Sequence, residues 1–125
     1  MLPDRSRASD AMNIRAYDAA CHRLSGATLT EQWGGAHVWK VGGKMFSIAA
    51  PDARPFRCSL KASDVARQAL AGQPGVRPAP YLARAGWLQI DDGAMPDSDI
   101  VDMLRVAHAL IAARLPKNLR MGLGG

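Results

Sequence analysis

The residues with the most suggestive chemistry are "VGGKMF", residues 41–46, where Gly42 and Gly43 precede Lys44. Glycines before a lysine are typical of loops that wrap a phosphate group. The P-loop needs the pattern GxxxxGK[ST], because its glycines let backbone N–H groups curl around phosphate and its hydroxyl holds magnesium. Here Met45 stands at the hydroxyl position and strand-like sequence follows. The pattern therefore argues against nucleotide hydrolysis and favours a tight turn.

The candidate nucleophiles have no general base that the sequence would place beside them. Three serines, Ser47, Ser59 and Ser63, have no base suggested by a motif. Cys21 and His22 are adjacent, and adjacent side chains diverge on a helix. We therefore predict no catalytic residue and expect a protein that is not an enzyme.

Metal and cofactor motifs are also missing from the sequence. The three histidines are scattered, and Asp97, Asp99 and Asp102 span one helix start, where favourable interaction with the helix dipole explains them. We expect no metal site and no cofactor. Cys21 and Cys58 sit in apolar sequence without CxxC spacing, which predicts two reduced, buried thiols; a disulfide between them is the less favoured alternative.

The charge is concentrated in the middle third of the 125-residue chain. Residues 40–84 carry eight Lys and Arg against two Asp, whereas the flanking segments are close to neutral, and the net charge is +5. A local surplus of this kind favours an anionic partner such as nucleic acid. The alternative is that a basic balance only keeps a small domain soluble.

The glycine pair is expected to join two antiparallel strands, "HVWKV" and "KMFSIAA". A two-residue connection would pair Trp39 with Phe46 and Val38 with Ser47. Trp39, Phe46 and Ile48 would then share the buried face. Lys40 would project to the outer face with Val38, Met45 and Ser47, and Lys44 would mark the tip.

The same alternation extends this outer face over the next strands. In "FRCSLK" it places Phe56, Cys58 and Leu60 inward and Arg57 and Lys61 outward. In "GWLQID" it sends Leu88 and Ile90 inward and Trp87 and Gln89 outward, with Arg77 and Arg84 on the flanking loop. The cations could contact phosphates and the indole could stack on an unpaired base. Alternatively, Trp87 belongs to the core and the cations only face water.

Three helices complete the predicted fold. One follows Asn13 as its N-cap and ends at Gly26, one follows Ser63 with an apolar stripe of Val65, Ala66, Ala69 and Leu70, and the longest is capped by Asp97 or Ser98 and stopped by Pro116. Strands joined by short turns predict the α+β class, with an antiparallel β-sheet and the N- and C-terminal helices packed on one face. We expect a single domain over residues 12–120, with flexible tails at 1–11 and 121–125.

No apolar run approaches the roughly 18 residues of a spanning helix, and the N-terminus lacks a secretory pattern. We therefore expect a cytoplasmic protein without a membrane partner.

Several segments together resemble the MmcQ/YjbR family of small bacterial proteins, over roughly residues 12–120. They are "VWKVGGKMFSI" (38–48), "CSLK" (58–61), "PGVRPAPYLARAGW" (74–87) and "ARLPKNLR" (113–120). The resemblance implies a fold similar to that of the bacterial frataxin homologue (CyaY-like) and DNA binding through a basic surface. Many members have histidines where this chain has Leu82 and Gly86, so no role is carried over for them.

The sequence thus leads to one functional hypothesis and one alternative. We predict a nucleic-acid-binding protein, with DNA favoured over RNA, whose phosphate contacts are Lys40, Lys44, Arg57, Lys61 and Arg84 and whose stacking residue is Trp87. The alternative is a protein-interaction or small-ligand-binding module, with an unidentified partner, that uses a groove near "RPAPYLARAGW".

Overall fold

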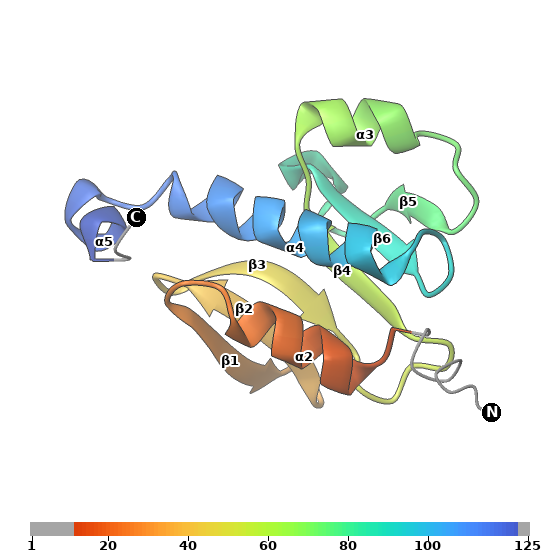
Figure 1. Cartoon of the computed structure of the whole chain (residues 1–125), viewed down its shortest axis with the longest axis horizontal. Coiled ribbons are helices and arrows are strands. Elements are labelled where there is room, and N and C mark those ends of the chain that lie inside the picture. The colour runs from red at the N-terminus through yellow and green to blue at the C-terminus, as the bar shows by residue number, and fades with distance from the viewer. Residues whose placement is uncertain (1–11, 123–125) are drawn as a thin grey trace.

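The computed structural model describes residues 12–122 and shows one six-stranded antiparallel sheet with helices, the predicted α+β class (Figure 1). The strand order is β1-β2-β3-β4-β6-β5. The strands are β1 (Ala27–Gln32), β2 (Ala36–Val41), β3 (Lys44–Ala49), β4 (Arg57–Lys61), β5 (Val76–Pro78) and β6 (Trp87–Asp91). The helices are α2 (Ile14–His22), α3 (Asp64–Leu70), the short 3-10 helix η1 (Ala83–Ala85), α4 (Asp97–Ala112) and α5 (Lys117–Met121).

Two helix starts follow the predicted caps. The side chain of Asn13 accepts a hydrogen bond from the Ala16 amide at 2.8 Å, and that of Ser63 accepts one from the Ala66 amide at 3.1 Å. Helix α4 starts differently from the prediction, since Pro96 is its N-cap and makes no side-chain cap. The fixed φ of proline orders this start, and Asp97 lies within the first turn instead of capping it.

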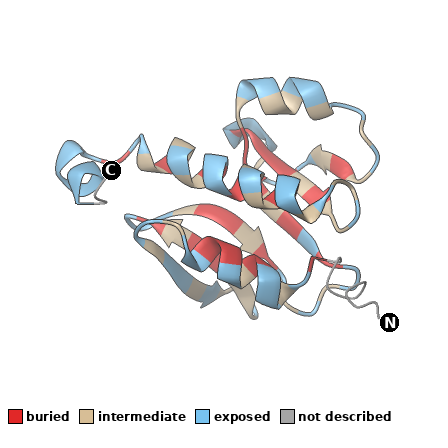
Figure 2. Cartoon of the chain, viewed as in Figure 1, coloured by how far each residue is buried: buried red, intermediate tan, exposed pale blue. Residues whose placement is uncertain are grey.

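The core lies between the sheet and helices α2 and α4, which pack on one face of it (Figure 1). Helix α4 buries Ile100, Leu104, Ala107 and Ile111, and Figure 2 shows its buried residues on the side that faces the sheet. Helix α3 differs from the prediction: it has no buried residue, and Val65 of its expected apolar stripe is 77% exposed. None of the helices in residues 12–122 is long and apolar enough to span a membrane.

The hairpin register corrects part of the predicted facing. Gly42 and Gly43 both have positive φ and connect β2 to β3 as expected, but the register shifts between Trp39 and Lys40. Trp39 therefore pairs with Ser47, and Val38 pairs with Ile48. This β-bulge reverses the alternation beyond Phe46, so that Ser47 is buried in the core and the prediction that Ile48 faces inward is wrong.

Three short elements were not predicted: β5, η1 and α5. The proline-rich connection contains β5, an edge strand, where Pro78 costs little because an edge position needs no N–H donor to the ladder. Pro116 ends α4 but is also the N-cap of α5, so Met121 belongs to a helix and not to a tail. Of the tails predicted at 1–11 and 121–125, residues 1–11 and 123–125 lie outside the described residues.

Candidate nucleic-acid interface

The strand register brings several chain segments together at one end of the strands. We call this end an edge of the sheet. The β2–β3 turn lies there, and Lys61 at the end of β4 pairs with Trp87 at the start of β6. The loop that leads from β5 into β6 begins at this same edge. The end of helix α4 also lies there, because Leu115, three residues after the helix, packs closely against the turn. A Cβ placed on Gly42 would lie only 2.6 Å from Cδ1 of Leu115.

Six cations on these segments form what we call the basic edge. All are exposed except Lys40, which is half-buried. No Asp or Glu among the described residues makes a salt bridge with any of them. The basic edge consists of Lys40 and Lys44 on the hairpin, Arg84 on η1, and Arg114, Lys117 and Arg120 after the end of α4.

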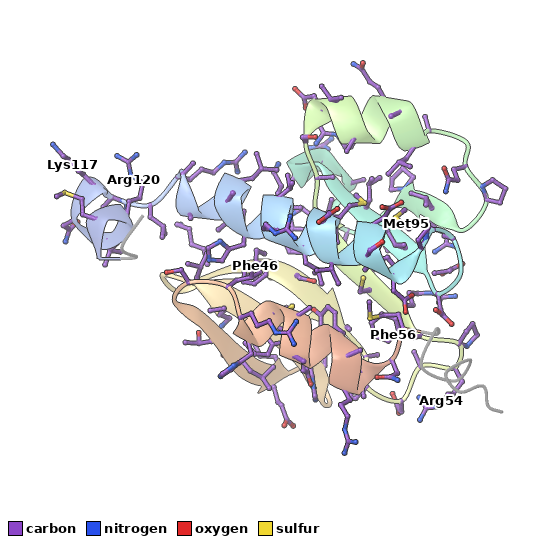
Figure 3. All side chains as sticks on the ribbon, in the orientation of Figure 1. Phe46, Arg54, Phe56, Met95, Lys117 and Arg120 are labelled. Carbon is purple, nitrogen blue, oxygen red and sulfur yellow. The ribbon has the colours of Figure 1, made fainter. Side chains whose placement is uncertain are left out.

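Most carboxylates collect at the other end of the sheet. The β1–β2 turn, the loop after β3 and the start of α4 lie there, and they bring acidic side chains. Figure 3 shows Lys117 and Arg120 at one end of the molecule and Arg54 at the other. The acidic residues of this second end are Glu31, Asp52, Asp91, Asp92, Asp97 and Asp99.

Lys61 is not available in the way that the sequence predicted. Its side chain is buried, and Nζ donates a hydrogen bond to the carbonyl of Ala85. Burial lowers the pKa of Lys61, and the nearby charges of Arg114 and Arg67 lower it further. The chain segment around Gly86 covers the ammonium group, so Lys61 is removed from any surface that could contact phosphate.

Trp87 is also covered, which corrects its prediction as an exposed stacking residue. It is only 4% exposed. The loop before it folds back, since the amide of Trp87 donates to the Leu82 carbonyl and the amide of Ala79 donates to the Trp87 carbonyl at 3.0 Å. The indole therefore faces a cavity under this loop and not the solvent.

Arg57 is exposed but lies away from the basic edge. It starts β4 at the acidic end, where its Nε donates to Oδ1 of Asp91 at 2.9 Å. Arg77 donates to the same carboxylate at 2.5 Å. The hydrogen bond from Arg77, assisted by Arg57, holds the pKa of Asp91 below its usual value. The structure thus brings Lys40, Lys44 and Arg84 together at one edge and leaves out Arg57, Lys61 and Trp87.

The sequence reasoning missed Arg114, Lys117 and Arg120. Counted along the chain, these cations are cancelled by Asp97, Asp99 and Asp102. In space Asp97 and Asp99 are separated from these cations, because the 16-residue helix α4, about 24 Å long, begins at the former and ends before the latter. Counting the charges separately for the residues at the start of the predicted helix and for those after its end would have found the basic group.

The buried polar cluster in the core offers no accessible chemistry. The Tyr17 hydroxyl donates to Ser47 Oγ at 2.8 Å, and Ser47 Oγ donates to the Ser59 carbonyl at 3.1 Å. Cys21 and Cys58 lie beside it as free, buried thiols, and burial raises the pKa of Cys58 to about 12. The cysteines are therefore reduced, as predicted, and held in their unreactive thiol form.

A second polar cluster, formed by Asp18, His37 and Trp39, links α2 to strand β2 by hydrogen bonds. Asp18 accepts a hydrogen bond from Trp39 Nε1 at 2.9 Å, and its other oxygen lies 2.8 Å from Nδ1 of His37. Trp39 is buried, so its indole N–H needs this acceptor. Among the described residues, no serine or cysteine contacts His37 as a nucleophile would.

Comparison with known proteins gives one family and one fold. The model of the YjbR family matches residues 22–110. No curated protein matches the sequence. The structure is similar to the crystal structure of Deinococcus radiodurans protein DR2400, which contains the family domain DUF419, with a TM-score of 0.77 and 24% sequence identity over 90% of this chain and 88% of that chain.

Proposed function

The chain belongs to the YjbR family, and we propose that it is a cytoplasmic nucleic-acid-binding protein that contacts phosphates through its basic edge. The observation that carries the proposal is a group of exposed cations without carboxylate partners on one edge of the described structure. Cations that already had partners would gain less from phosphate, because those partners would have to be released. We assign the protein a binding role and no catalytic one, with DNA favoured over RNA.

The arrangement of the basic edge suits a polyanion better than a small anion. Adjacent strands lie about 4.8 Å apart, and the cations come from a hairpin, a loop and the segment after a helix. A phosphate backbone can pass along such a row, whereas a single phosphate could reach only a part of it. Phosphate contacts of this kind give affinity without sequence preference.

The test is a salt-titrated binding assay with a labelled duplex. If about four phosphates are neutralised, affinity falls roughly a hundredfold between 50 and 200 mM salt, from a slope of about −0.9 per contact. The double variant Lys44→Glu with Lys117→Glu should lose affinity and show a smaller salt slope.

A control variant separates a defined edge from net charge alone. Arg15→Glu with Arg54→Glu changes the net charge by the same amount, but Arg54 is at the acidic end and Arg15 is in the first turn of α2. This control should bind nearly as well as the wild type. Equal losses in the two double variants would refute the basic edge as the site, and salt-insensitive binding or none at 50 mM salt would refute the function.

One observation favours the alternative of a small-ligand module. A cavity of about 300 Å³ lies between α3 and the start of β6, at the groove that the sequence suggested, and it is lined by Arg67, Leu70, Val76, Arg77, Pro78 and Trp87. Its volume is at the lower end of ligand sites. A small molecule that copurifies with the protein and resists high salt would support this alternative; Ala83→Phe, which points bulk at the cavity, should then reduce its occupancy.

A further inference from the structure

Tyr81 is presented to solvent in a way that folding does not explain. Its side chain is fully exposed, with a relative accessibility of 104%, and its backbone φ is 67°. A bulky residue in this left-handed region is strained, and the exposed ring gains no burial in return. Among the described residues only Trp33 shares this positive φ without being glycine.

The loop that carries Tyr81 is held firmly. The Leu82 amide donates to the Ala79 carbonyl at 3.1 Å, and the Leu82 carbonyl accepts from the amides of Ala85 and Trp87 at 3.1 and 3.3 Å. Pro80 precedes the tyrosine and restricts the backbone further. The ring therefore projects from an ordered support, which lowers the entropy cost of contacting a ligand.

The loop that carries the ring lies at the same strand ends as the cations of the basic edge. Arg84, three residues later on η1, is exposed. The loop connects β5 and β6 at the edge where Lys61 pairs with Trp87, and β3, which starts at Lys44, is the next strand beyond β4. An aromatic face and phosphate-binding cations thus lie on the same edge.

We propose that Tyr81 stacks on an unpaired base, and that the preferred ligand of the basic edge is single-stranded nucleic acid. This inference rests on the function proposed above. A paired base within a duplex already stacks on its neighbours on both sides, whereas an unpaired base can use the exposed ring. Cations that follow a backbone, combined with an aromatic side chain, are the usual means of binding single strands without sequence preference.

The experiment compares a labelled deoxythymidine oligonucleotide with a duplex of equal length. Tyr81→Ala should weaken single-strand binding about five- to 150-fold, the range observed when a stacking side chain is removed. It should leave duplex binding and the salt slope unchanged, because no cation is lost. Tyr81→Phe keeps the ring and should bind like the wild type.

Trp33→Ala is the matched control. Trp33 is 65% exposed and has a φ of 51°, but it lies in the β1–β2 turn at the acidic end. Its removal should not change binding to either ligand. Equal losses for Trp33→Ala and Tyr81→Ala would show that any exposed aromatic contributes, which would refute the proposal.

The outcomes separate this inference from the proposed function. If Tyr81→Ala binds single strands as well as the wild type while Lys44→Glu with Lys117→Glu does not, the stacking proposal is wrong and the basic edge stands. If Tyr81→Ala weakens both ligands equally, Tyr81 contributes to binding but not through an unpaired base, and the single-strand preference is refuted. If neither variant changes binding, both proposals fail.

Discussion

The two glycines of the β2–β3 turn should respond very differently to the same substitution. Both have positive φ, 58° at Gly42 and 81° at Gly43. A Cβ on Gly42 would lie 2.6 and 2.7 Å from the two Cδ atoms of Leu115, whereas a Cβ on Gly43 meets nothing within 4 Å. Alanine at either position costs about 1 to 2 kcal/mol for the left-handed backbone.

Only Gly42→Ala adds overpacking to this cost. Leu115 is buried, so its side chain can move only by disturbing its own packing, at about 1 to 3 kcal/mol. We therefore expect Gly43→Ala to lower the free energy of unfolding by about 1 to 2 kcal/mol. For Gly42→Ala, the two costs together predict a loss of about 2 to 5 kcal/mol.

The measurement is equilibrium urea unfolding followed by tryptophan fluorescence, with the m-value checked for constancy. Repeating Gly42→Ala in a Leu115→Ala background completes a double-mutant cycle, in which the overpacking cost of about 1 to 3 kcal/mol should disappear. The reasoning is refuted if the two glycine variants lose equal stability, or if the larger penalty at Gly42 persists without the leucine side chain. Agreement would show that the hairpin tip packs against Leu115, just after the end of α4. This contact holds the hairpin cations of the basic edge close to those that follow α4.

Two further predictions concern the acidic residues that hold the fold. Asp18→Ala leaves the buried indole N–H of Trp39 without its acceptor and should lower the free energy of unfolding by about 1 to 3 kcal/mol, whereas the exposed Asp52→Ala should change it little; similar urea midpoints for the two variants would contradict this. Asp91 has a lowered pKa in the folded state, so its contribution is present above its unfolded pKa of about 3.9 and is lost as the pH falls through the folded value. Melting temperatures measured from pH 6 to pH 2 should therefore fall more steeply for the wild type than for Asp91→Asn, and parallel curves would refute the linkage.

Local sequence patterns predicted most of the fold because most elements are locally encoded. Side-chain caps at Asn13 and Ser63 set two helix starts, and the alternation in β4 and β6 holds because their register is uninterrupted. The alternation failed at the bulge in β3. The sequence after Phe46 does not reveal the bulge, which places Ser47 in the core, where its hydroxyl is hydrogen-bonded to Tyr17.

The predicted site was less accurate because exposure depends on how a loop folds back over the strands. The outward direction of Lys61 and Trp87 follows from their strands, but their burial follows from the loop over residues 79–86, which folds back onto both. A period-two pattern contains no information about such a cover. The same loop covers Trp87 and exposes Tyr81. The aromatic residue available to a ligand is therefore Tyr81 and not the predicted Trp87, although both belong to the segment that the sequence singled out.

The separation of charge is explained by the helix dipole mainly at its acidic end. Asp97 and Asp99 lie in the first turn of α4, where the helix dipole stabilises carboxylates. The last turn of α4 contains no basic residue, and Lys40, Lys44 and Arg84 belong to a hairpin and a loop. The dipole at the end of α4 favours Arg114, which follows the C-cap Ala113, but it does not account for the other cations of the basic edge. Cations gathered without carboxylate partners repel one another, most strongly within a screening length of about 8 Å at physiological salt. A polyanion bound there, as we propose, would relieve this repulsion, and the charge asymmetry of the described residues would turn the basic edge toward it during the encounter.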